Sequence, residues 1–121
     1  MRYMLLLKGD PGPGTTLDET MVSALATFVQ ELARAGILLA AETLQPSATG
    51  ARIRFAGGGH SVVEGPFPDS SALIAGYILV DVRSKEEAIA WASRCPIDLA
   101  LGEGETTDVE IRRVLQLADA G

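Results

Sequence analysis

Two strand-like segments of this chain are apolar on both sides, and this feature constrains its fold more than any other. In residues 2–8, one side of the strand carries Tyr3, Leu5 and Leu7, and the other side carries Met4 and Leu6. Residues 37–44 are likewise apolar on both sides up to Glu42. An antiparallel sheet with one face in water shows alternating apolar and polar residues instead. The sheet of this chain therefore needs a covering layer on each face.

Two amphipathic helices are predicted, and each begins at a capping box. The first runs from the box at residues 16–19 to a cap at Gly36. The second begins at the box in residues 84–87 and ends near Arg94, because Pro96 disfavours helical geometry in the residue before it. Each helix has one apolar stripe, which core packing explains. Together the two helices can cover only one face of a small sheet.

The order of the predicted elements indicates the fold class. The other predicted strands, two of them joined as a hairpin by three glycines, are residues 51–55, 61–63, 76–82 and 107–114. Two right-handed β-α-β crossovers in one small sheet predict an α+β fold, a ferredoxin-like sandwich. We expect residues 1–114 to form this single domain and residues 115–121 to form a short C-terminal tail.

The second face of the predicted sheet requires a cover that the helices do not supply. A second copy of the chain, packed face to face about a twofold axis, is the economical solution and gives a dimeric α+β barrel. Loop segments of the same chain are the alternative, and we favour the second copy.

Charge and composition exclude several classes of function. The 121 residues include 10 basic and 16 acidic side chains, a net charge of -6, which disfavours a nucleic-acid partner. No apolar run approaches the roughly 20 residues that span a bilayer, and residues 1–8 lack the features of a secretory signal. One cysteine and one histidine offer no spacing for a metal site. We therefore expect a cytoplasmic protein without a membrane partner, a metal or another cofactor.

Five segments, in order along the chain, resemble the YCII-related family. They read Glu-Thr-Leu-Gln-Pro at 42–46, Val-Val-Glu-Gly-Pro-Phe at 62–67, Gly-Tyr-Ile-Leu-Val at 76–80, Glu-Glu-Ala-Ile-Ala-Trp-Ala at 86–92 with Cys-Pro at 95–96, and Val-Glu-Ile-Arg at 109–112. The chain is most similar to the branch with an Asp-Gly-Pro-Phe motif, the DGPF domain. The resemblance runs from residue 1 to about residue 114 and implies a dimeric α+β barrel in small bacterial cytoplasmic proteins. Most members lack an established reaction, and some are encoded beside, or fused to, extracytoplasmic-function sigma factors.

The chain departs from the family pattern at three places. Glu64 stands where the motif has Asp, and residues 69–72 read Asp-Ser-Ser-Ala where the family has Glu-Thr-Lys-Glu. The resemblance also implies a His–Asp pair for the better-known members, with the His on the first helix. The histidine of this chain is His60, in the glycine turn, so that mechanism does not carry over.

The irregular segment around the Glu-Gly-Pro-Phe sequence is the predicted ligand site. Glu64 could act as an acid or base if an apolar wall raises its pKa. The same position fits a carboxylate that fixes the following turn by accepting backbone N–H bonds, and we favour this interpretation. The candidate catalytic residue is Glu64, and the candidate ligand-binding residues are Glu64, Phe67, Ser70, Ser71, Tyr77 and Arg54.

Each of the other candidates also has a structural interpretation. Tyr77 could present its hydroxyl to the interior between paired sheets or pack in a core. Arg54, with Arg52, could bind an anion or keep an exposed strand soluble. His60 fits a proton shuttle or, as we favour, an exposed turn residue. Cys95 lies at a helix C-terminus, which disfavours a thiolate, so we do not expect a nucleophile there.

Two functions follow from these observations, and whether the protein is an enzyme stays open. The first is a homodimeric domain, small-molecule-binding or enzyme-like, with a cleft near the Glu-Gly-Pro-Phe loop. The alternative is a non-catalytic accessory or regulatory protein that acts through protein contacts, with an extracytoplasmic-function sigma factor as the partner that the resemblance suggests.

Overall fold

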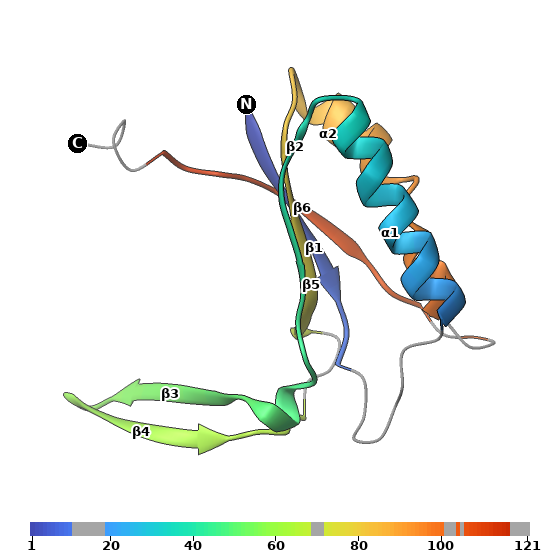
Figure 1. Ribbon diagram of the computed structural model, residues 1–121. Helices are drawn as coiled ribbons and strands as arrows, with labels where there is room; N and C mark the ends of the chain where they lie inside the picture. The colour runs from blue at the N-terminus through green and yellow to red at the C-terminus, as the bar shows by residue number, and fades with distance from the viewer. Residues whose placement is uncertain (11–18, 69–71, 101–103, 105, 117–121) are drawn as a thin grey trace.

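The computed structural model describes residues 1–10, 19–68, 72–100, 104 and 106–116 (Figure 1). The predicted cap Thr16, the candidate site residues Ser70 and Ser71 and most of the predicted tail lie outside these ranges. The elements are β1 (Arg2–Lys8), α1 (Glu19–Arg34), β2 (Leu38–Thr43), β3 (Ala51–Ala56), β4 (Gly59–Glu64), β5 (Ile74–Asp81), α2 (Lys85–Ala92) and β6 (Val109–Arg113), with 3-10 turns η1 (Ser47–Thr49) and η3 (Pro96–Ala100).

Four strands form one antiparallel sheet in the order β2-β5-β1-β6. Both α-helices lie on the same face of this sheet, as Figure 1 shows with the sheet seen edge-on. The predicted α+β class, with two helices and antiparallel strands, is confirmed. The sheet of a single chain is open and does not close into a barrel. The predicted barrel would need a second copy and stays a prediction.

The core lies between the sheet and the helices, and strand alternation determines which residues enter it. Along β1, every second residue is buried against the helices, while the residues between them are half-buried on the other face. Leu5 of β1 and Leu32 of α1 are 0% exposed. The buried cluster comprises Tyr3, Leu5, Leu7, Phe28, Leu32, Ile78, Val80, Val82, Ala88, Ala92 and Cys95. No helix in the described part of the chain is long and apolar enough to cross a membrane.

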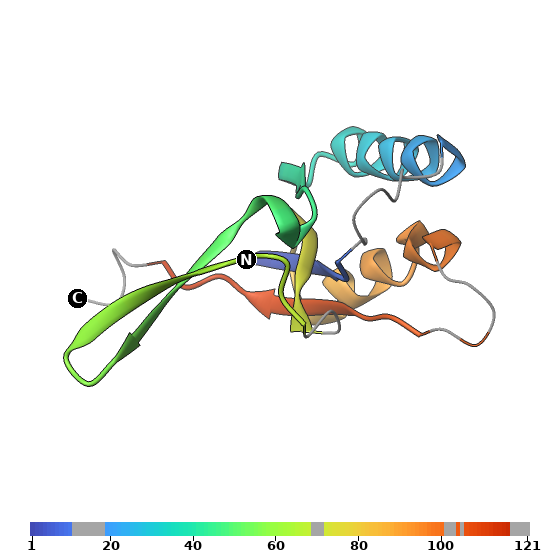
Figure 2. The ribbon, with the colours of Figure 1, turned by 90° about the horizontal axis from the view of Figure 1, so that it is seen from below.

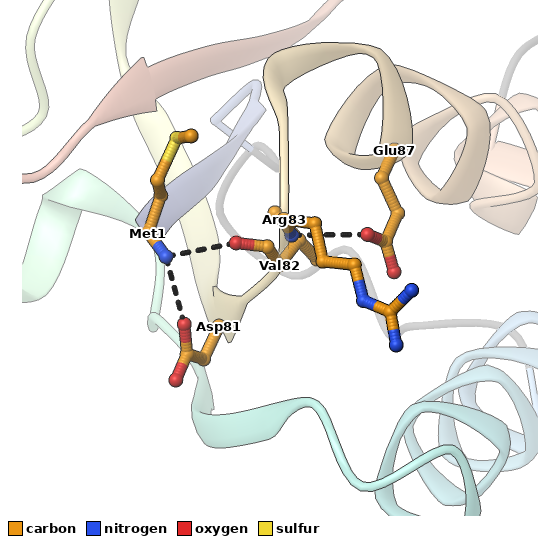
Figure 3. Close-up of polar contacts among 5 residues, drawn as sticks. All are labelled: Met1, Asp81, Val82, Arg83 and Glu87. Carbon is orange, nitrogen blue, oxygen red and sulfur yellow. Dashed lines mark hydrogen bonds and ion pairs between the residues drawn. The ribbon is translucent and has the colours of Figure 1, made fainter.

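The second capping box is confirmed, with one bond displaced by a residue, which Figure 3 shows between Arg83 and Glu87. Ser84 accepts a hydrogen bond from the backbone N–H of Glu87 at 3.1 Å, as a capping box requires. The Glu87 carboxylate accepts from the backbone N–H of Arg83, at 3.0 Å, and not from Ser84 itself. The same figure shows the Met1 amino group donating to the Asp81 carboxylate and the Val82 carbonyl, which joins the start of β1 to the end of β5.

The sheet face opposite the helices, called the open face below, has an apolar centre. Leu6 of β1 lies beside Tyr77 of β5, and Met4 lies beside Leu79 in the next row. All four side chains are half-buried. Charged residues flank them on the outer strands, with Glu42 beside Tyr77 on β2, and with Glu110 beside Leu6 and Arg112 beside Met4 on β6. The expected second apolar face is therefore present, and neither helix covers it.

Strands β3 and β4 form a separate two-stranded sheet, called the arm below, that projects away from the four-stranded sheet. Figures 1 and 2 both place the arm on the side opposite the helices. Its turn is the predicted glycine turn: Gly57 and Gly58 have φ of 57° and 81°, the positive values of a two-residue hairpin loop. Because this loop is so short, both strands are longer than predicted and reach Ala56 and Gly59.

Candidate functional site

Three loops meet at the base of the arm through a single serine. The backbone N–H and the hydroxyl of Ser47, in η1, donate to the two carboxylate oxygens of Asp10 at 2.6 and 2.5 Å. The Ser47 hydroxyl oxygen accepts from the backbone N–H of Phe67 at 3.0 Å. These bonds lower the pKa of Asp10, the hydroxyl of Ser47 having the larger effect and its N–H the smaller, because both stabilise the charged carboxylate. We call Asp10, Ser47, Gly65 and Phe67 the loop junction.

Gly65 belongs to the loop junction because its backbone lies directly against η1. A β-carbon at this position would lie 1.7 Å from the carbonyl oxygen of Ser47 and 2.6 Å from its carbonyl carbon. The Gly65 N–H donates to the carbonyl oxygen of Gly50 at 2.9 Å, and the Gly65–Pro66 peptide is cis. The glycine of the Glu-Gly-Pro-Phe sequence is therefore required by close backbone contact.

The phenylalanine of the same sequence holds an arginine of the arm. The guanidinium carbon of Arg52 lies 4.0 Å from the centroid of the half-buried Phe67 ring, within the range of a cation–π contact. Arg54, the arginine predicted to bind a ligand, lies two residues further along β3 and is exposed beside Ser61. Of the two arginines, the one packed at the base of the arm is thus Arg52.

Glu64 ends β4 with its side chain exposed, on the same arm face as its cross-strand neighbour Ala51. Within the described ranges its carboxylate accepts no hydrogen bond and forms no ion pair. The bonds that fix the following turn there come from Ser47 and Gly50 instead. Among the described residues, the turn-fixing role expected for Glu64 is therefore performed by other side-chain and backbone groups.

Tyr77 lies in the four-stranded sheet and not in the arm. It occupies the middle of the open face, between Leu6 and Glu42. Across the described residues, Glu64, Phe67, Tyr77 and Arg54 make no polar or ring contact with one another. Of the described candidates, Arg54 and Glu64 thus lie in the arm, Phe67 lies in the loop after it, and Tyr77 lies in the four-stranded sheet.

His60 lies near the tip of the arm, and Cys95 lies in the core. His60 is exposed beside the arm turn, with its ring centroid 5.9 Å from that of Phe55. Cys95 is buried in the core, and burial is the main cause that raises its pKa to about 11. Its thiol stays protonated near neutral pH, which agrees with the expectation that it is no nucleophile.

Among the described residues, a shallow groove lies on the helical side. Its volume is about 330 Å³, and its lining residues are Ser23, Ala24, Thr27, Phe28, Glu31, Arg94 and Pro96. Glu31 and Arg94 pair with each other there, and the Arg94 guanidinium also lies over the Trp91 ring. The charges of this groove are therefore satisfied internally. Over the part of the chain that the structure describes, no three His, Cys, Asp or Glu residues gather as metal ligands.

Comparison with known proteins decides the family. A family model described as the YCII-related domain matches residues 1–114. The chain belongs to the YCII-related family. An uncharacterised protein of Rhizobium meliloti (strain 1021) is 28% identical to it over 95 residues, which cover 78% of this chain and 73% of that protein.

Sequence reasoning missed two residues of the loop junction in this YCII-related domain. Asp10 and Ser47 each lie beside prolines in loops, and 37 residues separate them in the chain. Asp and Ser are frequent in loops because their short side chains form hydrogen bonds to nearby backbone. A property shared by so many loop residues does not identify Asp10 or Ser47 in particular. Only the return of β2 beside β5 brings the two loops together at one end of the sheet.

Proposed function

We propose that this YCII-related protein is a homodimeric small-molecule-binding domain. In it, the open faces of two ferredoxin-like sandwiches pack together as a dimeric α+β barrel. The observation that carries the proposal is the open face, where Met4, Leu6, Tyr77 and Leu79 form an apolar centre that no helix covers. Removing apolar surface from water stabilises an assembly by about 25 cal/mol per Å². Paired sheets about 10 Å apart are the usual way to bury two such faces.

The ligand cleft of the proposed dimer lies between chains, near the Glu-Gly-Pro-Phe loop. Two observations support this position. Glu64 has no side-chain partner within the described ranges, and hydrogen bonds of the loop junction hold the backbone of Gly65 and Phe67, which follow it. A second chain against the open face would add a wall beside the base of the arm and enclose Glu64. A carboxylate in such a cleft suits a small ligand that presents hydrogen-bond donors or a positive charge.

We further propose, from the resemblance alone, that the protein belongs to the DGPF branch, with Glu64 in the position of its aspartate, and that it is cytoplasmic. In the second candidate function the protein is a non-catalytic regulator that binds another protein, such as an extracytoplasmic-function sigma factor. The exposed apolar side chains of the arm favour it, because an exposed apolar patch is typical of a protein-binding surface.

The dimer is tested by placing a charged side chain in the apolar centre of the open face. Leu79→Arg places a charge at its centre, and we expect this variant to be a folded monomer while the unmodified protein is a dimer. Ile89→Arg makes a comparable change at an exposed site on α2 and should leave the dimer intact. Light scattering after size-exclusion chromatography gives the masses, and circular dichroism reports folding. A monomeric unmodified protein would overturn the proposal.

The cleft is tested through Glu64 by mass spectrometry of the native dimer and a thermal-shift screen of small molecules. We expect to find a ligand that raises the melting temperature of the unmodified protein. Its dissociation constant for Glu64→Gln should be at least tenfold higher than for the unmodified protein. Glu86→Gln, a matched change in the first turn of α2, is the control. If both variants bind every stabilising compound like the unmodified protein, Glu64 is not part of a site.

A further inference from the structure

One face of the arm is apolar and exposed in the single chain. Cross-strand pairing places Ile53 beside Val62 and Phe55 beside His60, so these side chains share a face. The exposed fractions of Ile53, Phe55 and Val62 are 57%, 77% and 60%. An isolated two-stranded hairpin is at best marginally stable in water, and a contiguous exposed apolar patch on such a hairpin indicates a surface that is covered in use.

We infer that the apolar face of the arm packs against a second copy of this chain. The inference rests on the dimer proposed above and adds a second contact to it. Each chain would contribute its open face to the centre of the dimer and its arm to the flank of the other chain. The arm contact is therefore made twice, once by each chain, as twofold symmetry requires.

The direction and the length of the arm support this occupant. The arm projects on the open-face side of the sheet, where the second copy packs (Figures 1 and 2). Each of its strands has 6 residues. At about 3.3 Å per residue such strands are roughly 20 Å long, whereas packed sheets lie only about 10 Å apart. The arm would thus extend beyond the sheet of the second copy and flank it.

The loop junction gives the arm a fixed direction. Ser47 bonds to Asp10 and Phe67, and Gly65 lies against the backbone of Ser47, so the base of the arm is joined to the end of β1 and to η1. A contact surface that is held in place before binding loses less conformational entropy when it binds. The junction therefore makes the arm a prepared contact surface.

Charge complementarity also favours a second copy. The arm, residues 51–64, carries Arg52, Arg54 and Glu64, a net charge of +1. The whole chain has a net charge of -6, so the rest of it carries -7. A basic arm is attracted to the acidic body of another copy, and such attraction guides the orientation of the contact.

Arm packing also explains the place of Glu64. Glu64 lies on the same arm face as Ile53 and Val62, at the end of the arm nearest the sheet. When that face is covered, Glu64 lies at the edge of the contact between the two chains. The inter-chain cleft proposed above would then be bounded by the arm of one chain and the body of the other.

The test uses full-length protein and compares two faces of the arm. Phe55→Ser and Val62→Ser remove apolar side chains from the face that we infer to be covered. Ser61→Ala changes the opposite face at an exposed position and leaves the charge of the arm unchanged. Sedimentation equilibrium gives the dimer dissociation constant, which we expect to rise at least tenfold in each apolar variant and less than threefold in Ser61→Ala. Hydrogen exchange gives a second measure, with arm amides protected in the unmodified dimer and exchanging fast in the Leu79→Arg monomer.

The outcomes separate this inference from the proposal beneath it. One outcome is that the unmodified protein is dimeric, that the apolar variants dimerise as tightly as it does, and that the arm amides exchange equally in dimer and monomer. In that case the arm inference is wrong and the dimer proposal stands. If arm amides become protected only when a different protein is added, the inference is also wrong and the regulatory function gains support. If the unmodified protein is monomeric, both the dimer and the arm contact are refuted.

Discussion

Both carboxylate oxygens of Asp10 accept hydrogen bonds from Ser47, which lies 37 residues further along the chain. Ser47 in turn accepts a bond from the backbone of Phe67, so one serine joins the loop after β1 to both ends of the arm. The Glu-Gly-Pro-Phe sequence therefore has an architectural role that is visible in a single chain. Its glycine and phenylalanine fix the arm, and its glutamate is left exposed.

Removing the Ser47 hydroxyl should loosen the arm. Ser47→Ala leaves one Asp10 oxygen and the Phe67 N–H without this partner, and we expect a loss of about 1 kcal/mol in the free energy of unfolding. Hydrogen exchange at the arm amides should rise. Thr49→Ala removes an exposed hydroxyl bond in the same 3-10 turn and is the control. Equal effects of the two substitutions would contradict a special role for Ser47.

Acid should weaken the loop junction. The pKa of Asp10 is lowered from its ordinary value of 3.8, since Ser47 donates to the charged form. A carboxyl whose pKa is lower in the folded state contributes stability that is fully present above its ordinary pKa and is lost as the pH falls through the folded pKa. The predicted loss therefore begins below about pH 4.

Asp10→Asn should flatten part of that pH dependence, measured by chemical denaturation across a pH series. The pKa of Glu110 is also lowered, first by its hydrogen bond to Arg112 and then by the charge of Lys8. Acid sensitivity should therefore decrease in Asp10→Asn without disappearing. An unchanged pH profile in this variant would show that the Asp10 bonds do not contribute.

Gly65→Ala should be severely disruptive for its size. The added methyl group would overlap the backbone of Ser47, and backbone cannot move aside as a flexible side chain can. We expect a loss of about 1–3 kcal/mol, as for overpacking of a tight site. Gly50→Ala is the matched control, because a β-carbon there meets only an ordinary contact at 3.6 Å. Thermal unfolding of both variants decides the point, and equal midpoints would refute the close contact.

The Cys95 thiol should react slowly in the folded protein. Its pKa is raised to about 11 because burial disfavours the thiolate. Because the pKa of Cys95 is higher in the folded state, its contribution to the stability of the fold is fully present below the pKa of the thiol in the unfolded chain. This contribution declines as the pH rises towards 11. Ellman's reagent at pH 8 should label the folded chain far more slowly than the unfolded chain. Similar rates in both states would place Cys95 at the surface.

Local patterns predicted most of the elements, because the information lies within a few residues of each. The Ser84 cap, the Gly57-Gly58 turn and the alternation along β1 all needed only sequence spacing. The open apolar face could be predicted in part: β1 is apolar on both sides as expected, but the other half of the apolar centre comes from β5 and not from β2.

The site was less predictable, since it depends on contacts between distant loops. Asp10 and Ser47 meet only after the sheet has formed, and no spacing rule connects them. Arg52 and Arg54 share a face of β3, and only the position of the Phe67 ring shows that Arg52 packs at the base of the arm. Ser70 and Ser71 lie outside the described residues, so their predicted roles stay predictions.

The most direct test of the central claim, that a second copy covers the open face, is the mass of the unmodified protein in solution. Sedimentation equilibrium across micromolar concentrations should give twice the chain mass of 12.7 kDa. The Leu79→Arg variant should give the mass of a single folded chain under the same conditions. An unmodified protein that sediments as one chain would contradict the account, because the apolar centre formed by Met4, Leu6, Tyr77 and Leu79 would then face water.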